Sequence, residues 1–184
     1  MIERTISKEI IEEANKHSSE RMQFEYNRFK LSSEQRKTMI LIGTIGQLLF
    51  KEYVTEQKVP FEFEYQAGSY DAMDFKLGQD IVEIKTSGYE DNVGFEYLNL
   101  LYNKDQFDGG IRKGFKYCVL LFINGYSRKT KLLNLSQCSK GIIAGYIPFE
   151  KIQEFPNAKQ FYGDDFKVPL AKFSDIKQLT DNYI

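Results

Sequence analysis

Hydrophobic residues recur at helical intervals along the first third of the chain. A narrow apolar stripe over about residues 7–29 predicts a first helix. A second helix has a clearer start, because Ser32 and Gln35 have the spacing of a capping box. The apolar positions are Ile10, Ile11 and Ala14 in the first helix and Ile42, Ile45, Leu49 and Tyr53 in the second.

From Phe61 the hydrophobic period changes from helical to alternating, which predicts a half-buried strand. Two further strands follow, one on each side of Gly78 and Gln79. The remaining predicted elements are a polar helix over about 96–107, a near-continuous apolar strand over 115–123 buried on both faces, and shorter strands over 132–135 and 142–147.

The chain has no internal repeat, low-complexity segment or linker, so we expect one domain over residues 1–184. Within it we expect an N-terminal helical segment over 1–38, a core over about 39–147 and a C-terminal packing segment over 148–184.

Composition excludes several classes of function. Two cysteines and the single histidine, His17, are too few for a zinc ribbon, a cysteine-ligated iron–sulfur site or a disulfide framework. No apolar stretch approaches the roughly 20 residues that span a bilayer, and the charged N-terminus does not resemble a signal peptide. We therefore expect a cytoplasmic protein.

Charge is unevenly distributed, although the net charge is only −1. Residues 104–140 hold eight basic and two acidic residues, which gives 8 − 2 = +6. This stretch is interpreted either as a solvated surface or as a strip that binds phosphates. Its basic residues are Lys104, Arg112, Lys113, Lys116, Arg128, Lys129, Lys131 and Lys140, set against Asp105 and Asp108.

The candidate chemistry lies in the hairpin around Gly78 and Gln79. These two residues suit a two-residue turn with glycine at the position of positive φ, so facing residue numbers sum to 157. Asp74 then faces Glu83, and the alternation of side chains places Lys85 on the same face. The opposite face is apolar and holds Met73, Phe75, Leu77, Val82 and Ile84.

Two facing carboxylates in a hairpin have Cβ atoms only about 4.5–5.5 Å apart and repel each other. A divalent cation reverses that repulsion, because Mg²⁺ prefers hard oxygen ligands. Lys85, two residues after Glu83, could orient an attacking water or stabilise charge on phosphate oxygens. The competing interpretation is a surface ion pair between Lys85 and Glu83.

The order helix, three strands, helix and strand, together with Asp74, Glu83-Ile84-Lys85 and Thr86-Ser87, resembles the PD-(D/E)XK superfamily of restriction-endonuclease-like nucleases. The resemblance implies a three-layer αβα sandwich around a mixed β-sheet and Mg²⁺- or Mn²⁺-dependent phosphodiester hydrolysis. By this resemblance, Asp74, Glu83 and the Ile84 carbonyl would ligate the metal, and Lys85 would activate water. Many relatives place a glutamate where this chain has Gln47 after Gly46. Asp71 is a rival for Asp74.

The sequence thus predicts an endonuclease that hydrolyses DNA, acting in restriction, phage defence or DNA processing. Cutting both strands requires two sites, so a homodimer is compatible with this prediction. Two alternatives stay open. One is a catalytically inactive DNA-binding module with the nuclease fold, favoured by Gln47. The other is a protein-interaction domain in which the hairpin charges are only surface charges.

Overall fold

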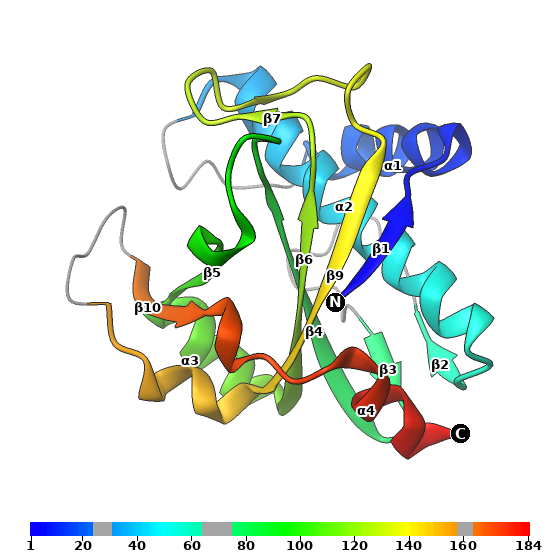
Figure 1. Cartoon of the computed structure of the whole chain (residues 1–184), viewed down its shortest axis with the longest axis vertical. Helices are drawn as coiled ribbons and strands as arrows, with labels where there is room; N and C mark the ends of the chain where they lie inside the picture. The colour runs from blue at the N-terminus through cyan, green and yellow to red at the C-terminus, as the bar shows by residue number, and fades with distance from the viewer. Residues whose placement is uncertain (24–30, 64–74, 158–163) are drawn as a thin grey trace.

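A central mixed β-sheet lies between two layers in the computed structural model, which describes residues 1–23, 31–63, 75–157 and 164–184 (Figure 1). The helices are α1 (Lys8–Arg21), α2 (Ser33–Glu56), α3 (Lys104–Lys113) and α4 (Ile176–Thr180). The strands are β1 (Ile2–Thr5), β2 (Phe61–Glu62), β3 (Phe75–Leu77), β4 (Asp80–Gly88), β5 (Asn99–Asn103), β6 (Phe115–Ile123), β7 (Tyr126–Ser127), β8 (Leu132–Leu133), β9 (Lys140–Pro148) and β10 (Asp164–Pro169). Short 3-10 turns occupy Phe95–Tyr97, Phe149–Glu154, Leu170–Lys172 and Asp181–Tyr183.

The main sheet has six strands in the order β1-β9-β6-β4-β3-β2. Strand β4 pairs with β6 in parallel, and the other neighbouring pairs are antiparallel. Parallel strands cannot be joined by a tight hairpin turn and need a longer crossover connection. Here the connection from β4 to β6 runs through β5 and α3. The class of fold is therefore mixed α/β. Strands β5 and β10 form a separate antiparallel pair beside α3 (Figure 1).

Strand β6 separates two hydrophobic clusters, as its near-continuous apolar sequence predicts. Its side chains alternate between the cluster under α1 and α2 and the cluster beside α3, β5 and β10. The prediction of a strand buried on both faces is confirmed. The first set is Val119, Leu121 and Ile123, and the second is Cys118, Leu120 and Phe122.

Polar caps fix where the helices begin. The Ser32 hydroxyl accepts from the Gln35 N–H, and the Gln35 side chain accepts from the Ser32 N–H, so the predicted capping box is present. Ser7 caps α1 in a simpler way by accepting from the Ile10 N–H. No helix within the described ranges has the length and apolar character needed to cross a membrane.

The predicted helix over 96–107 is wrong for most of its length. Its first residues form a 3-10 turn and strand β5, and helix α3 begins only at Lys104. Leu100 and Tyr102 are buried while Leu101 is 49% exposed, which is a strand period. Asn103 then ends the strand and caps α3, because its side-chain oxygen accepts from the Asp105 N–H at 2.9 Å.

The other strand predictions are confirmed with altered lengths. Only Leu132 and Leu133 of the predicted 132–135 strand are extended, and the predicted 142–147 strand is the centre of β9. The predicted strand at Phe61 is β2, which the described residues follow only through residue 63.

Candidate active site on strand β4

The hairpin of β3 and β4 has the register that the sequence predicts. Phe75 pairs with Val82 and Leu77 pairs with Asp80, so the facing numbers sum to 157. Gly78 has a φ of 58°, the left-handed conformation that glycine adopts without steric cost. Asp74 and Asp71 lie outside the described residues, so their predicted places in this hairpin stay predictions.

Alternate residues of β4 point toward different layers. Val82 and Ile84 belong to the hydrophobic cluster beneath α2, and Thr86 packs against Gly46 of that helix. Glu83 and Lys85 contact residues of β5 and α3 instead. The predicted sorting of this strand into an apolar face and a charged face is therefore confirmed for the described residues.

Glu83 is a buried carboxylate with two partners on one oxygen. The residue is only 8% exposed. The Tyr102 hydroxyl donates to Glu83 Oε1 at 3.2 Å, and Lys85 Nζ lies 3.2 Å from the same atom. Burial of a charge is costly unless it is paired and hydrogen-bonded, and both conditions are met here.

Lys85 links the Glu83 carboxylate to the layer formed by β5 and α3. Its ammonium lies 4.5 Å from the centroid of the Tyr102 ring, within the range of a cation–π interaction. It also donates to Gln106 Oε1 on α3 at 3.4 Å. The Lys85 side chain as a whole is 26% exposed, so it combines fixed partners with partial access to solvent.

Tyr102 is not among the residues that the sequence pattern singles out. The pattern predicts a helix for the stretch that contains Tyr102, whereas the structure places Tyr102 on β5, in the layer that faces Glu83 and Lys85. The alternation of Leu98, Leu100 and Tyr102 is the signal that could have placed the phenol in the interior. Gln106 of α3 also belongs to this cluster, because its side-chain oxygen accepts from the Lys85 ammonium.

The chemistry of the described site fits part of a Mg²⁺ or Mn²⁺ site. Glu83 supplies a hard anionic oxygen donor, and the Lys85 side chain beside it is 26% exposed. Among the described residues, no three His, Cys, Asp or Glu side chains gather closely enough to hold a metal ion by themselves. Ile84, whose carbonyl is a predicted ligand, lies between Glu83 and Lys85 in β4.

Gln47 belongs to the layer on the other face of β4. It follows Gly46 on α2 and is 8% exposed. A Cβ on Gly46 would lie 1.9 Å from Thr86 Oγ1, so helix and strand are in close contact at this point. This close packing explains the mid-helix glycine, and it places Gln47 on a helix that covers the face opposite the Glu83 and Lys85 side chains.

The predicted basic strip is divided in the structure. Arg112, Lys113 and Lys116 lie near the start of β6, and the other predicted group lies in the connection from β7 to β8, beyond the end of β6. The part of β6 from Lys116 to Ile123 separates the groups by about 23 Å. This second group consists of Arg128, Lys129 and Lys131.

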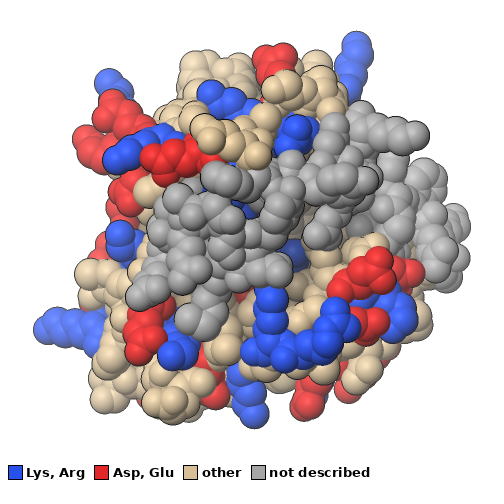
Figure 2. All heavy atoms as spheres, turned by 180° about the vertical axis from the view of Figure 1, so that it is seen from behind, with Lys and Arg blue, Asp and Glu red and all other residues tan. Residues whose placement is uncertain are grey.

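The two remaining basic residues have acidic partners. Lys104 pairs with Asp108 at 3.1 Å one helical turn away, and Lys140 pairs with Glu3 at 3.1 Å. Figure 2 shows Lys and Arg intermixed with Asp and Glu over the visible described surface. The sequence total of +6 therefore does not correspond to one continuous basic surface on the part of the chain described.

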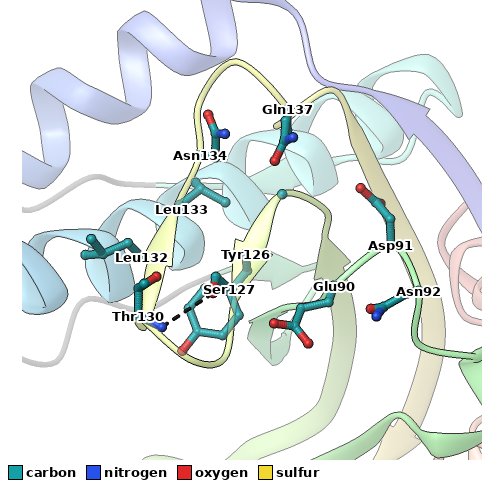
Figure 3. A pocket seen from close by; sticks show the side chains of 11 residues that line it. Glu90, Asp91, Asn92, Tyr126, Ser127, Thr130, Leu132, Leu133, Asn134 and Gln137 are labelled. Carbon is teal, nitrogen blue, oxygen red and sulfur yellow. Dashed lines mark hydrogen bonds between the residues drawn. The ribbon is translucent and has the colours of Figure 1, made fainter.

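A separate groove of about 600 Å³ lies beyond the end of β4 (Figure 3). Two of its polar side chains accept hydrogen bonds from backbone N–H groups of nearby loops. Glu90 accepts from the Arg128 N–H at 2.9 Å, and Asn134 accepts from the Ser136 N–H at 3.1 Å. The lining residues are Glu90, Asp91, Asn92, Gly125, Tyr126, Ser127, Thr130, Leu132, Leu133, Asn134 and Gln137. Neither Glu83 nor Lys85 is among them, so the groove is distinct from the candidate site.

Comparison of the chain with models of known protein families, with curated proteins and with solved structures found no match.

Proposed function

We propose that this protein is a metal-dependent nuclease that hydrolyses phosphodiester bonds in DNA. The observation that carries the proposal is the pair formed by Glu83 and Lys85. The carboxylate of Glu83, a residue only 8% exposed, and the ammonium of the partly exposed Lys85 side chain lie 3.2 Å apart on one face of a hairpin strand. The sequence predicts Asp74 as the next member of that face, opposite Glu83.

The order of elements supports the same proposal. Helix α2 is followed by β2, β3 and β4 of the main sheet, then by β5 of the separate two-stranded sheet and by α3, and then by β6, which lies parallel to β4. With β5 as an addition before α3, this is the order of helix, three strands, helix and strand that the PD-(D/E)XK resemblance implies. Flanking layers on both faces of a mixed sheet are compatible with its αβα sandwich, and that finer assignment is part of the proposal.

In this function Asp74, Glu83 and the Ile84 carbonyl would hold Mg²⁺ or Mn²⁺, with Asp71 as the rival of Asp74. Gln47 lies on the helix that covers the opposite face of β4 and is therefore not assigned to this ion. Such an ion would supply Lewis-acid stabilisation of charge on the phosphate oxygens. The Lys85 ammonium would stabilise charge developing on those oxygens or orient the attacking water. Its fixed position matters, because an electrostatic group is most effective when it needs no reorganisation during the reaction.

Lys85→Ala tests the proposal, with Lys76→Ala as a matched control. Both lysines lie in the same hairpin, pair with a glutamate at 3.2 and 3.0 Å, and have side chains 26% and 31% exposed. We expect Lys85→Ala to abolish Mn²⁺-dependent cleavage of plasmid, single-stranded and branched DNA while DNA binding and the circular dichroism spectrum persist. Lys76→Ala should cleave normally. Full activity in Lys85→Ala, or cleavage by the wild type in EDTA, would overturn the proposal.

A second candidate function is a DNA-binding module that does not cut. It is favoured by Gln47, a neutral amide at the position where many members of the PD-(D/E)XK superfamily have a glutamate. It predicts DNA affinity that falls with salt, no cleavage with any divalent ion, and no Mn²⁺ uptake that depends on Glu83. The same incubations with and without Mn²⁺ separate the two functions.

A further inference from the structure

We infer that Tyr102 is the positioning residue of the candidate active site, because it fixes the Glu83 carboxylate with its hydroxyl and the Lys85 ammonium with its ring. The inference rests on the proposed nuclease function and assigns a role to a residue outside the Asp74, Glu83 and Lys85 set.

The geometry is a three-way contact. The Tyr102 hydroxyl lies 3.2 Å from Glu83 Oε1, and Lys85 Nζ lies 3.2 Å from the same oxygen and 4.5 Å from the centre of the Tyr102 ring. A phenol presents an O–H donor at its edge and a negative π face, so one side chain attracts an anion and a cation at once. Phenylalanine would keep the second attraction and lose the first.

Tyr102 can act as a fixed reference because its own ring is held firmly. The residue is 1% exposed, and its ring packs edge-on against Phe149 at 5.7 Å with an interplanar angle of 86°. Its backbone lies in β5, where it pairs with Phe166 of β10. A buried ring with few rotamers transfers this rigidity to the two charged side chains, which are longer and more flexible.

Positioning of this kind has a direct consequence for the proposed chemistry. A catalytic constellation must be held within about 0.5 Å of its productive geometry, and carboxylates that bind metal need their own hydrogen-bond partners. Gln106 on α3 also helps to position Lys85, because its side-chain oxygen accepts from the Lys85 ammonium at 3.4 Å. Tyr102 differs from Gln106 in contacting both members of the charged pair.

Tyr102→Phe tests the inference, and Tyr53→Phe is its matched control. Tyr53 is also 1% exposed and its hydroxyl also has a side-chain partner, Thr180 Oγ1 at 3.3 Å, but it lies in the cluster beneath α2. The two variants thus remove the same atom from equally buried rings on opposite faces of the sheet. Mn²⁺ affinity is measured by calorimetry and cleavage by steady-state kinetics.

We expect Tyr102→Phe to weaken Mn²⁺ binding about 10-fold and to lower kcat to a similar extent, within the range of about 10–100-fold found when partners of metal ligands are removed. The KM for DNA should stay nearly unchanged, because Tyr102 is too buried to contact DNA. Tyr53→Phe should leave both quantities unchanged. Tyr102→Leu, which also removes the π face, should lose more activity than Tyr102→Phe.

The outcomes separate the inference from the proposed function. If the wild type cleaves DNA and Tyr102→Phe keeps wild-type Mn²⁺ affinity and kcat, the positioning role is overturned and the nuclease stands. Equal losses in Tyr102→Phe and Tyr53→Phe would also overturn it. A wild-type protein that neither cleaves DNA nor binds Mn²⁺ would overturn both the positioning role and the nuclease function. Should Tyr102→Phe fail to fold, Phe149→Leu loosens the same ring indirectly, and it must lower kcat without raising KM for the inference to survive.

Discussion

The two faces of strand β4 are buried to nearly the same depth and are built from opposite chemistry. Ile84 is 6% exposed beneath α2, and its neighbour Glu83 is 8% exposed on the side of β5 and α3. Burial of the Ile84 side chain stabilises the fold by removing apolar surface from water. Burial of the Glu83 carboxylate is possible because Tyr102 donates a hydrogen bond to it and Lys85 pairs with its charge. Equal burial therefore has different consequences on the two faces. The apolar face stabilises the fold, and the charged face holds a carboxylate in a defined position.

The largest expected difference between the faces is in stability. We expect Ile84→Ala to lower the free energy of unfolding by about 2–5 kcal/mol, because it leaves a cavity beneath α2. The combined change Glu83→Gln and Lys85→Met, which neutralises the ion pair at similar volume, should stay within about 1 kcal/mol of the wild type or stabilise the chain. Urea unfolding followed by circular dichroism measures both.

The double variant should nevertheless lose Mn²⁺-dependent cleavage completely, whereas Ile84→Ala should keep it at temperatures where the variant remains folded. If the double variant were as unstable as Ile84→Ala, the charged face would be a structural element. The distinction between the two faces would then fail.

The sequence determines this hairpin well because the governing signals are local. The two-residue period of Phe75, Leu77, Val82 and Ile84 and the left-handed Gly78 fix the register without reference to any distant element. A one-residue slip would expose the whole apolar set, so few alternatives compete. The helix beginning after Ser32 is determined in the same way, since both hydrogen bonds of its capping box span three residues.

The elements that complete the site depend on contacts distant in sequence. Strand β5 forms because it pairs with β10, more than 60 residues later in the chain. Its own sequence, in which Asn99 and Asn103 flank three apolar or aromatic residues, predicts a strand only weakly. The place of Tyr102 against Glu83 follows from this pairing. The total of +6 between residues 104 and 140 is a sum along the sequence, but β6 carries its members to opposite ends of a strand. A net charge summed along the sequence therefore does not show whether the charged residues lie close together in space.

Close packing of α2 against the apolar face gives a second, smaller test. Gly46→Ala should lower the free energy of unfolding by about 1–3 kcal/mol, because the new Cβ would meet Thr86 at 1.9 Å and the helix must move. Gly43 lies on the same helix, and a Cβ added there would have no atom within 4 Å, so Gly43→Ala should stabilise by up to about 1 kcal/mol. Thermal unfolding separates the two glycines, and equal effects would contradict the packing argument.

A pH-dependent effect of about the same size concerns Cys138, which is buried in the cluster beneath α2. Burial raises the pKa of its thiol from 9.0 to about 11. Below pH 9 the thiol is protonated in the folded and unfolded chains alike, but between pH 9 and 11 only the unfolded chain releases the proton. Stability is therefore lost as pH rises through this window, by about 1.4 kcal/mol at pH 10. A Cys138→Ala variant lacks this component, and the difference between the two pH profiles isolates it from titrating tyrosines.

Thiol reactivity gives an independent measurement of the same shift. In a Cys118→Ala background Cys138 is the only thiol of the chain. Because the thiolate is the reactive form, we expect native alkylation at pH 9 to be about 50-fold slower than in urea, before any further protection by burial. Reaction of the native chain with a midpoint near pH 9 would show that water reaches the apolar side of the sheet. In that case the contrast between a dry face and a charged, partly accessible face of β4 would need to be abandoned.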